Sequence, residues 1–234
     1  MNKLVDYLSL SLYTPMVSFL LAIGALVIGL TRKNKPASLR FFPFYFTAYV
    51  IISFSVFIVA GLPDRYGNLI NLISPLLDLV LTLIEFWVFA RFFAGILTRP
   101  RDRNILRLIR VVFFFLTFLI VSRDIVLHLR LRQETLQVIF TIQAISLLVP
   151  CMAYFVSIFT YTPVSTLKDE PHFWVVTGLS FMLICTFPLS LFLNYIEAHE
   201  SGLYRYLFAI FYIFYSLLFL MIIRAYLCNP TSDK

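Results

Sequence analysis

Residues 75–93, PLLDLVLTLIEFWVFARFF, form a strongly apolar stretch that contains two acids and one base. As a helix, about 20 such residues at ~1.5 Å each cover the ~30 Å hydrocarbon core of a bilayer. Asp78, Glu85 and Arg91 interrupt the stretch, and charge is costly at that depth. The stretch therefore predicts a membrane-crossing helix and marks its acids as candidate functional residues.

The composition extends this prediction to the whole chain. Of its 234 residues, 61% are hydrophobic and only 13% are charged, whereas soluble proteins carry about a quarter charged residues. The polar segments are all shorter than the roughly 50 residues that a soluble domain needs. We therefore expect one transmembrane domain over residues 1–234.

Hydropathy divides the chain into seven apolar segments, which predicts an all-α, seven-transmembrane-helix bundle. The third helix is expected to begin near Ser74 and Pro75, because proline is tolerated in a first turn. Pro150 and Pro188 fall inside the fifth and sixth segments and are expected to kink them. The predicted spans are 12–30, 42–61, 70–97, 108–129, 136–160, 172–196 and 205–227.

Lysines and arginines predict the orientation, since they favour cytoplasmic loops. With the N-terminus outside and the C-terminus cytoplasmic, the inner connections hold about twice as many of these residues as the outer ones. Arg123, Arg130 and Arg132 lie on the outer side in this arrangement, and a re-entrant pair of segments four and five would change the count. The net charge of +7 follows this topology, so we expect the lipid bilayer and not nucleic acid as the partner.

Asp78 and Glu85 lie on one face of the third helix. They are seven residues apart, which is nearly two helical turns, and Thr82 lies between them on the same face. Arg91 is turned away and is expected to extend toward the inner headgroups. Two interpretations of Glu85 stay open: a site for a proton, a cation or a small ligand, or a neutral group that hydrogen-bonds a neighbouring helix.

Polar stripes on other segments could meet these acids. The residues selected as a candidate ligand- or ion-binding set with Asp78, Thr82 and Glu85 are Gln143, Ser190, Asn194 and Tyr215. Tyr45, Tyr49 and Ser53 share one face of the second segment. Each stripe alone is ordinary helix-packing material, but together they predict a polar interior.

Catalytic and cofactor-binding patterns are not found. The chain has no H-E-x-x-H, G-x-S-x-G or P-loop motif, and no span contains a lysine that could carry retinal. His128, His172 and His199 all lie at the ends of spans, which disfavours haem held between helices. We expect no cofactor, no metal site and no catalytic residues.

Three stretches resemble a group of small, uncharacterised seven-span membrane proteins of bacteria: LTLIEFWVFARFF (81–93), DEPHFWVVTGLSFM (169–182) and YIFYSLLFLMIIRAYL (212–227). In that group a Glu-Phe pair lies in the third span and an acidic-Pro-x-Phe-Trp motif opens the sixth. The motif residues here are Glu170, Pro171 and Trp174. The resemblance implies seven spans, a bacterial inner membrane and a place beside sensory and signalling systems.

The leading hypothesis is a non-enzymatic module that senses or relays a signal, with a polar intramembrane site around Glu85. It would bind a small ligand or a proton and act through a membrane or cytoplasmic signalling partner. The alternative is a small proton- or cation-coupled transporter or channel that uses Asp78 and Glu85. An intramembrane enzyme is a third option, but the acids lack the flanking residues of recognised catalytic motifs.

Overall fold

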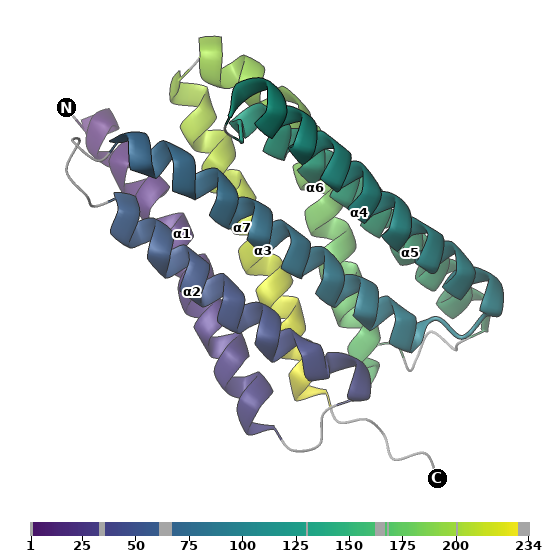
Figure 1. The fold of residues 1–234 in the computed structure, drawn as a ribbon. Helices are drawn as coiled ribbons and strands as arrows, with labels where there is room; N and C mark the ends of the chain where they lie inside the picture. Colours follow the sequence, from purple (N-terminus) through teal and green to yellow (C-terminus); the bar gives the residue numbers. More distant parts are fainter. Residues whose placement is uncertain are drawn as a thin grey trace.

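A computed structural model of the chain describes residues 2–32, 36–60, 67–129, 131–161, 167, 169–199 and 201–228 (Figure 1). The described residues form helices throughout, with one short 3₁₀ helix, η1, at Ala37–Phe41. The seven long helices are α1 (Asn2–Thr31), α2 (Phe42–Ala60), α3 (Gly67–Ile96), α4 (Pro100–His128), α5 (Gln133–Tyr161), α6 (Pro171–His199) and α7 (Ser201–Leu227).

The helices pack side by side as one bundle in which α7 has a central place (Figure 1). α7 packs against α1 and α6, and α2 packs against α1 and α3. α5 packs against α3, α4 and α6. α4 lies at the edge, where it packs mainly on α5 and less extensively on α3.

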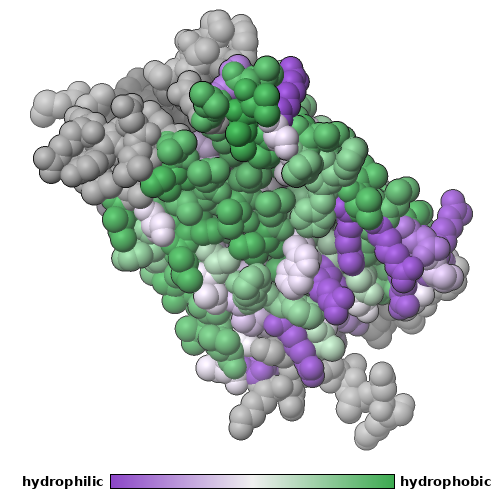
Figure 2. Space-filling view, in the orientation of Figure 1, coloured by the Kyte–Doolittle hydropathy of each residue, from purple (hydrophilic) through white to green (hydrophobic). Residues whose placement is uncertain are grey.

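All seven helices are long and apolar enough to cross a membrane, so the predicted multi-pass helical fold is confirmed. Apolar side chains cover the body of the bundle, and hydrophilic residues gather toward its ends (Figure 2). The apolar stretches Pro100–His128 and Gln133–Thr160 are each of membrane-crossing length. The fourth and fifth segments therefore need not be a re-entrant pair.

Three helix starts differ from the prediction. α3 begins at Gly67, so Pro75 lies inside it and does not mark its start. α4 begins at Pro100, eight residues before the predicted span, because proline fits the first turn of a helix and Asp102 there complements the helix dipole. Hydropathy detected only the apolar part of this helix. α1 likewise begins at Asn2, before the predicted span.

Aromatic rings and one glycine hold the centre of the bundle together. The Phe219 ring on α7 lies 5.4 Å from Phe46, 5.0 Å from Tyr49 and 6.2 Å from Tyr215. Gly178 lets α6 and α7 approach closely, since a Cβ at that position would lie 2.8 Å from the Cβ of Met221. In this packing the Tyr215 side chain of α7 reaches the Glu85 side chain of α3.

Candidate functional site

Glu85 lies at the centre of the bundle, near the middle of the apolar stretch Leu72–Ile96 of α3. Only 2% of its surface is exposed. The hydroxyl of Tyr215, on α7, donates a hydrogen bond to Glu85 Oε2 over 3.3 Å. The side-chain amide of Gln143, on α5, also interacts with this carboxyl group. The structure thus brings together three of the predicted site residues from three helices.

Two tyrosines of α2 complete this group. Tyr45 is fully buried, and both Tyr45 and Tyr49 lie close enough to Glu85 to interact with its charge. The rings of Tyr49 and Tyr215 stack with 6.5 Å between their centroids. We refer to Tyr45, Tyr49, Glu85, Gln143 and Tyr215 as the Glu85 cluster. The sequence assigned Tyr45 and Tyr49 only to a polar stripe on the second span and not to the site.

The Glu85 cluster contains polar atoms with unused hydrogen-bonding capacity. Within the described part of the chain, Glu85 Oε1, Gln143 Oε1 and Tyr45 Oη are buried without a hydrogen-bond partner. Such atoms are uncommon in folded proteins, and leaving one unpaired costs about 1–3 kcal/mol. Three of them in one cluster indicate a place where a small polar ligand, a water molecule or a proton would be stabilised.

Asp78 and Thr82 do not extend this network as the shared helix face suggested. Asp78 lies about 10 Å from Glu85 along the axis of α3. Among the described residues, no hydrogen bond or ion pair reaches its carboxylate. Thr82 is buried, but its hydroxyl donates to the backbone oxygen of Asp78 over 2.7 Å. No contact of the described side chains therefore links the two acids.

Two polar side chains on α6 also form hydrogen bonds within their own helix. Ser190 is buried and donates to the backbone oxygen of Phe187, and Thr186 donates to that of Met182. These are bonds to the preceding turn of the same helix. Asn194 belongs to α6, but its side chain lies outside the described part of the structure. Within the described part of the chain, Ser190 therefore makes no hydrogen bond to the Glu85 cluster.

The motif that opens α6 forms a separate polar chain at the other end of this helix. Glu170 contacts Nδ1 of His172, and Nε2 of His172 lies 2.7 Å from the hydroxyl of Ser38 in η1. The hydrogen bond from His172 holds the pKa of Glu170 below its ordinary range. Pro171 is buried as the first residue of α6. This chain, which we call the η1–α6 latch (Ser38, Glu170 and His172), ties the first connection to the sixth helix.

Trp174, the last residue of the motif, faces α7. The guanidinium of Arg224 lies 5.6 Å from the centroid of its ring, within the range of a cation–π interaction. The motif therefore has structural contacts with both η1 and α7. The sequence marked Glu170 and Trp174 and the motif includes His172, but nothing in the sequence revealed Ser38 as the partner of His172.

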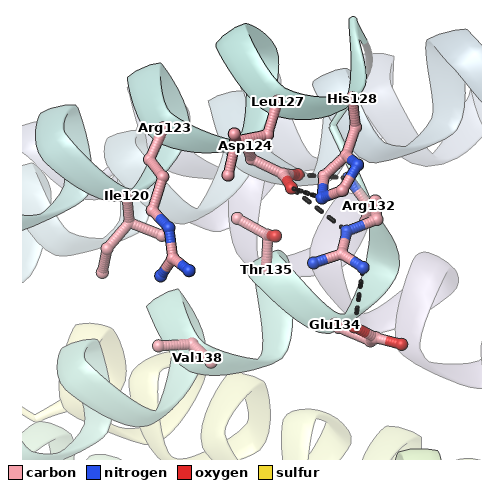
Figure 3. A pocket seen from close by; sticks show the side chains of 9 residues that line it. All are labelled: Ile120, Arg123, Asp124, Leu127, His128, Arg132, Glu134, Thr135 and Val138. Atoms are coloured by element: carbon pink, nitrogen blue, oxygen red, sulfur yellow. Dashed lines mark hydrogen bonds and ion pairs between the residues drawn. The ribbon is translucent and has the colours of Figure 1, made fainter.

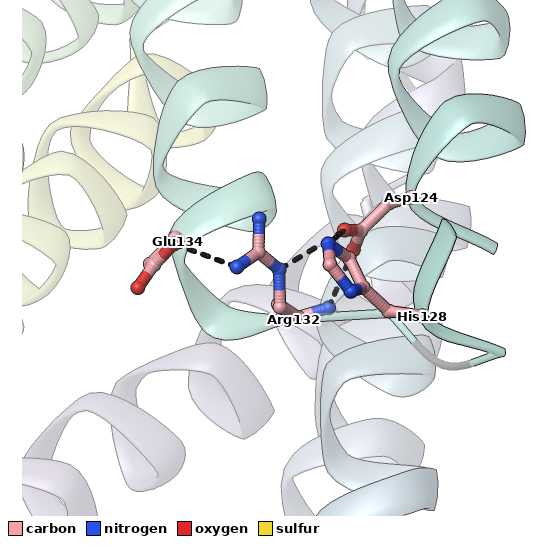
Figure 4. Close-up of polar contacts among 4 residues, drawn as sticks. All are labelled: Asp124, His128, Arg132 and Glu134. Atoms are coloured by element: carbon pink, nitrogen blue, oxygen red, sulfur yellow. Dashed lines mark hydrogen bonds and ion pairs between the residues drawn. The ribbon is translucent and has the colours of Figure 1, made fainter. Parts of the chain in front are cut away.

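A third polar group lies at the turn between α4 and α5, at the opposite end of the bundle from the latch (Figure 3). Asp124 is 5% exposed, and its carboxylate accepts hydrogen bonds from the backbone N–H of Arg132 at 2.7 Å and from its Nε at 3.1 Å. Arg132 also pairs with Glu134 at 3.3 Å (Figure 4). Leu129 adopts a left-handed conformation with φ of 55° at the end of α4. Asp124 thus fixes the turn between α4 and α5.

Among the described residues, no three His, Cys, Asp or Glu side chains lie close enough together to hold a metal ion. Arg91, on the face of α3 away from the cluster, is exposed and lies 5.4 Å from the centroid of Phe41.

Neither a protein-family model, nor a curated protein, nor a solved structure matches this chain.

Proposed function

We propose that this protein is a non-enzymatic sensory or signal-relay module in which the Glu85 cluster binds a small polar ligand or a proton. The observation that carries the proposal is the set of three buried polar atoms, Tyr45 Oη, Glu85 Oε1 and Gln143 Oε1, that lack partners among the described residues. They come from α2, α3 and α5, so an occupant would bridge three helices. A ligand that binds one packing of these helices better than another would shift the bundle between them.

The polar ends of the bundle suggest how a signal would leave the membrane. Arg103 donates to the backbone oxygen of Leu97, just after α3, and Arg110 donates to that of Ala90 inside the last two turns of α3, so both join the start of α4 to the end of α3. Arg99, the N-cap residue of α4, and Arg101 in its first turn are both exposed. These two residues are the surface we propose for contact with a membrane or cytoplasmic signalling partner.

The proposal includes the membrane and the orientation. We place the protein in a bacterial inner membrane, in line with the resemblance of its motifs, with the N-terminus outside and the C-terminus cytoplasmic. The ends of α1, α3 and α5 would then face the cytoplasm together with the basic start of α4.

A proton- or cation-coupled transporter is the second candidate, and it is favoured by one observation. The Asp78 carboxylate lies within a membrane-crossing stretch without a hydrogen-bond or ion-pair partner among the described side chains. Such an acid could take part in a pathway for ions. The missing link between Asp78 and Glu85 is the reason we place this function second.

Flux measurements separate the two functions. The wild type and Glu85→Gln are reconstituted in liposomes that contain a pH-sensitive dye, and proton or cation gradients are imposed. The sensory proposal predicts no gradient-driven flux from either protein. Wild-type flux that Glu85→Gln abolishes would replace the sensory proposal with the transporter.

An infrared measurement tests the site itself. Difference spectra of the wild type between neutral and alkaline pH should contain a carboxyl C=O band that Glu85→Gln removes, because a protonated carboxyl has this band and a carboxylate does not. Asp78→Asn is the matched control and should leave that band in place. A spectrum that Glu85→Gln does not alter would contradict a proton- or ligand-responsive Glu85.

A further inference from the structure

The turn between α4 and α5 contains a cavity of about 230 Å³ (Figure 3). Its walls come from one face of α4 and from the first turns of α5. This volume is smaller than the roughly 300–1,000 Å³ of sites for drug-sized ligands, so it suits a small group. The residues that line it are Ile120, Arg123, Asp124, Leu127, His128, Arg132, Glu134, Thr135 and Val138.

One charged side chain in this cavity has no hydrogen-bond or ion-pair partner among the described residues. Arg132 is offset by Asp124, which is almost fully buried, and by Glu134 at the exposed rim. Arg123 extends from α4 toward α5 in Figure 3 and has no hydrogen-bond or ion-pair partner among the described residues. The cavity therefore presents one guanidinium whose charge is not compensated by the surrounding described side chains.

His128 is a second available donor. Its Nε2 lies 3.9 Å from Asp124 Oδ1, which is too far for a hydrogen bond. The Thr135 hydroxyl also lines the cavity but is hydrogen-bonded to Asp124, so the remaining donors are the imidazole and the Arg123 guanidinium. These are groups that recognise the oxygens of a phosphate, for which arginine is especially suited because its planar fork can bind two oxygens at once.

The remaining walls are apolar and continue onto the lipid-facing surface. Leu127 is 59% exposed and Val138 is 49% exposed, and Ile120 lies one helical turn further into the bilayer. The cavity lies at the ends of two membrane-crossing helices, which is the depth of the headgroups. A molecule with a phosphate and an apolar part would match both kinds of wall.

Topology supports the same conclusion. In the orientation we propose, Arg123 and Arg132 lie on the outer side, where the loop-charge rule disfavours them. Arg132 has a structural reason to be there, because it pairs with Asp124 across the turn. Arg123 has no such reason in the described structure, and a ligand for its side chain would supply one.

We propose that the α4–α5 cavity binds a phosphate-bearing anion, with Arg123 as its principal ligand-binding residue. The inference stands apart from the function of the Glu85 cluster. Asp124 and Arg132 are positioning residues in it, since they hold the first turn of α5 against the end of α4. The phosphate can come from a lipid headgroup or from solution, and the two sources are distinguished experimentally.

Native mass spectrometry of the full chain in detergent provides the test. The probes are phosphatidic acid and a diacylglycerol with the same acyl chains, which lacks the phosphate. The variants are Arg123→Gln and the matched control Arg107→Gln, an exposed arginine at the other end of the same helix. We expect Arg123→Gln to lower the fraction of phosphatidic acid bound by about tenfold, the effect of losing a charged hydrogen bond, and Arg107→Gln to leave it unchanged.

Inorganic phosphate then identifies the source. Displacement of phosphatidic acid from the wild type by inorganic phosphate means that the site takes free phosphate, and retention of the lipid means that the site needs the acyl chains too. Circular dichroism of each variant reports that it is folded, and Arg123→Lys should retain part of the binding. Equal losses in Arg123→Gln and Arg107→Gln, or equal binding of phosphatidic acid and diacylglycerol, would overturn the proposal.

Discussion

The Tyr215 hydroxyl on α7 and the Glu85 carboxyl on α3 meet across 3.3 Å, near the middle of both membrane spans. This contact joins helices that are separated by most of the sequence. It also joins a predicted acid to a predicted partner, so it is the first contact to remove by mutation.

Tyr215→Phe should lower the free energy of unfolding by about 1 kcal/mol, because it leaves a second oxygen of Glu85 without a partner. The measurement is equilibrium unfolding in mixed micelles. Tyr13→Phe is the matched control, since Tyr13 is 62% exposed. In a double-mutant cycle, Tyr215→Phe should cost less in the Glu85→Ala background, which removes the acceptor. Strictly additive effects of the two substitutions would contradict a direct interaction.

Gly178→Ala should destabilise the bundle by about 1–3 kcal/mol through overpacking. The added methyl group would meet Met221 at its Cβ, which cannot move without the backbone of α7. Gly24→Ala is a close control, because a Cβ there has nothing within 4 Å. It should be neutral or slightly stabilising, since alanine favours a helix. Equal effects of the two substitutions would argue against close contact of α6 and α7.

The η1–α6 latch should make stability depend on pH at the acidic side. The pKa of Glu170 is lowered by its hydrogen bond to His172. A carboxyl with a lower pKa in the folded than in the unfolded state stabilises the fold above its unfolded pKa, and this contribution is lost as the pH falls through the folded pKa. The wild type should therefore lose more stability than Glu170→Gln between neutral and acidic pH. The effect is small, because Glu170 is 38% exposed and partly screened by solvent.

This comparison is made by unfolding each protein over a pH series. His172→Gln removes the partner and should reduce the same pH dependence, which serves as the second variant. Identical pH profiles for the wild type and Glu170→Gln would contradict a stabilising role for the ionised carboxylate.

Ser38 should not react as an enzyme nucleophile. The order of Ser38, His172 and Glu170 in the latch matches that of a serine hydrolase relay, in which histidine bridges serine and a carboxylate. Hydrolases also need oxyanion donors beside the serine. Under the non-enzymatic function that we propose, the wild type should show no labelling by a fluorophosphonate probe. Labelling that Ser38→Ala removes would overturn the non-enzymatic proposal.

The proposed orientation predicts which ends of the bundle can be labelled from outside. In a background without the native cysteines, single cysteines replace Thr98 and Gln133, both exposed at opposite ends of the bundle. A membrane-impermeant maleimide added to intact cells should react with the cysteine at position 133 and not with the one at 98. The reverse pattern would mean that the N-terminus is cytoplasmic.

The sequence was sufficient for the number and approximate limits of the spans, because hydropathy depends on local composition. It failed at the start of α4, where Pro100 and Asp102 favour a helix that extends beyond its apolar part. Pro75 was misleading for a related reason: a membrane helix can continue through a proline when its surroundings satisfy the freed backbone groups.

The candidate site was predictable only in part. Glu85 stood out because acids are rare within spans, and Tyr215 and Gln143 stood out as polar residues on other spans. Whether such residues meet depends on how the helices rotate and pack, which local patterns do not determine. Ser190 and Thr82 illustrate this, since both are buried but bond to their own helices. The contact between Ser38 and His172 crosses 134 positions and had no sequence signal.

α7 connects the membrane interior to one surface of the protein. Tyr226 lies eleven positions after Tyr215, which is about 16 Å along the helix. The Tyr226 hydroxyl donates to the backbone oxygen of Leu39 over 3.2 Å. A hydrogen-bonded helix resists stretching, so these two tyrosines move largely as one body. A shift of α7 that opens the Tyr215–Glu85 contact would also pull on η1, which contains Leu39. A change at Glu85, deep in the bilayer, can therefore reach η1 through α7 alone, because this rigid helix carries the Tyr215 hydroxyl at Glu85 and the Tyr226 hydroxyl at Leu39.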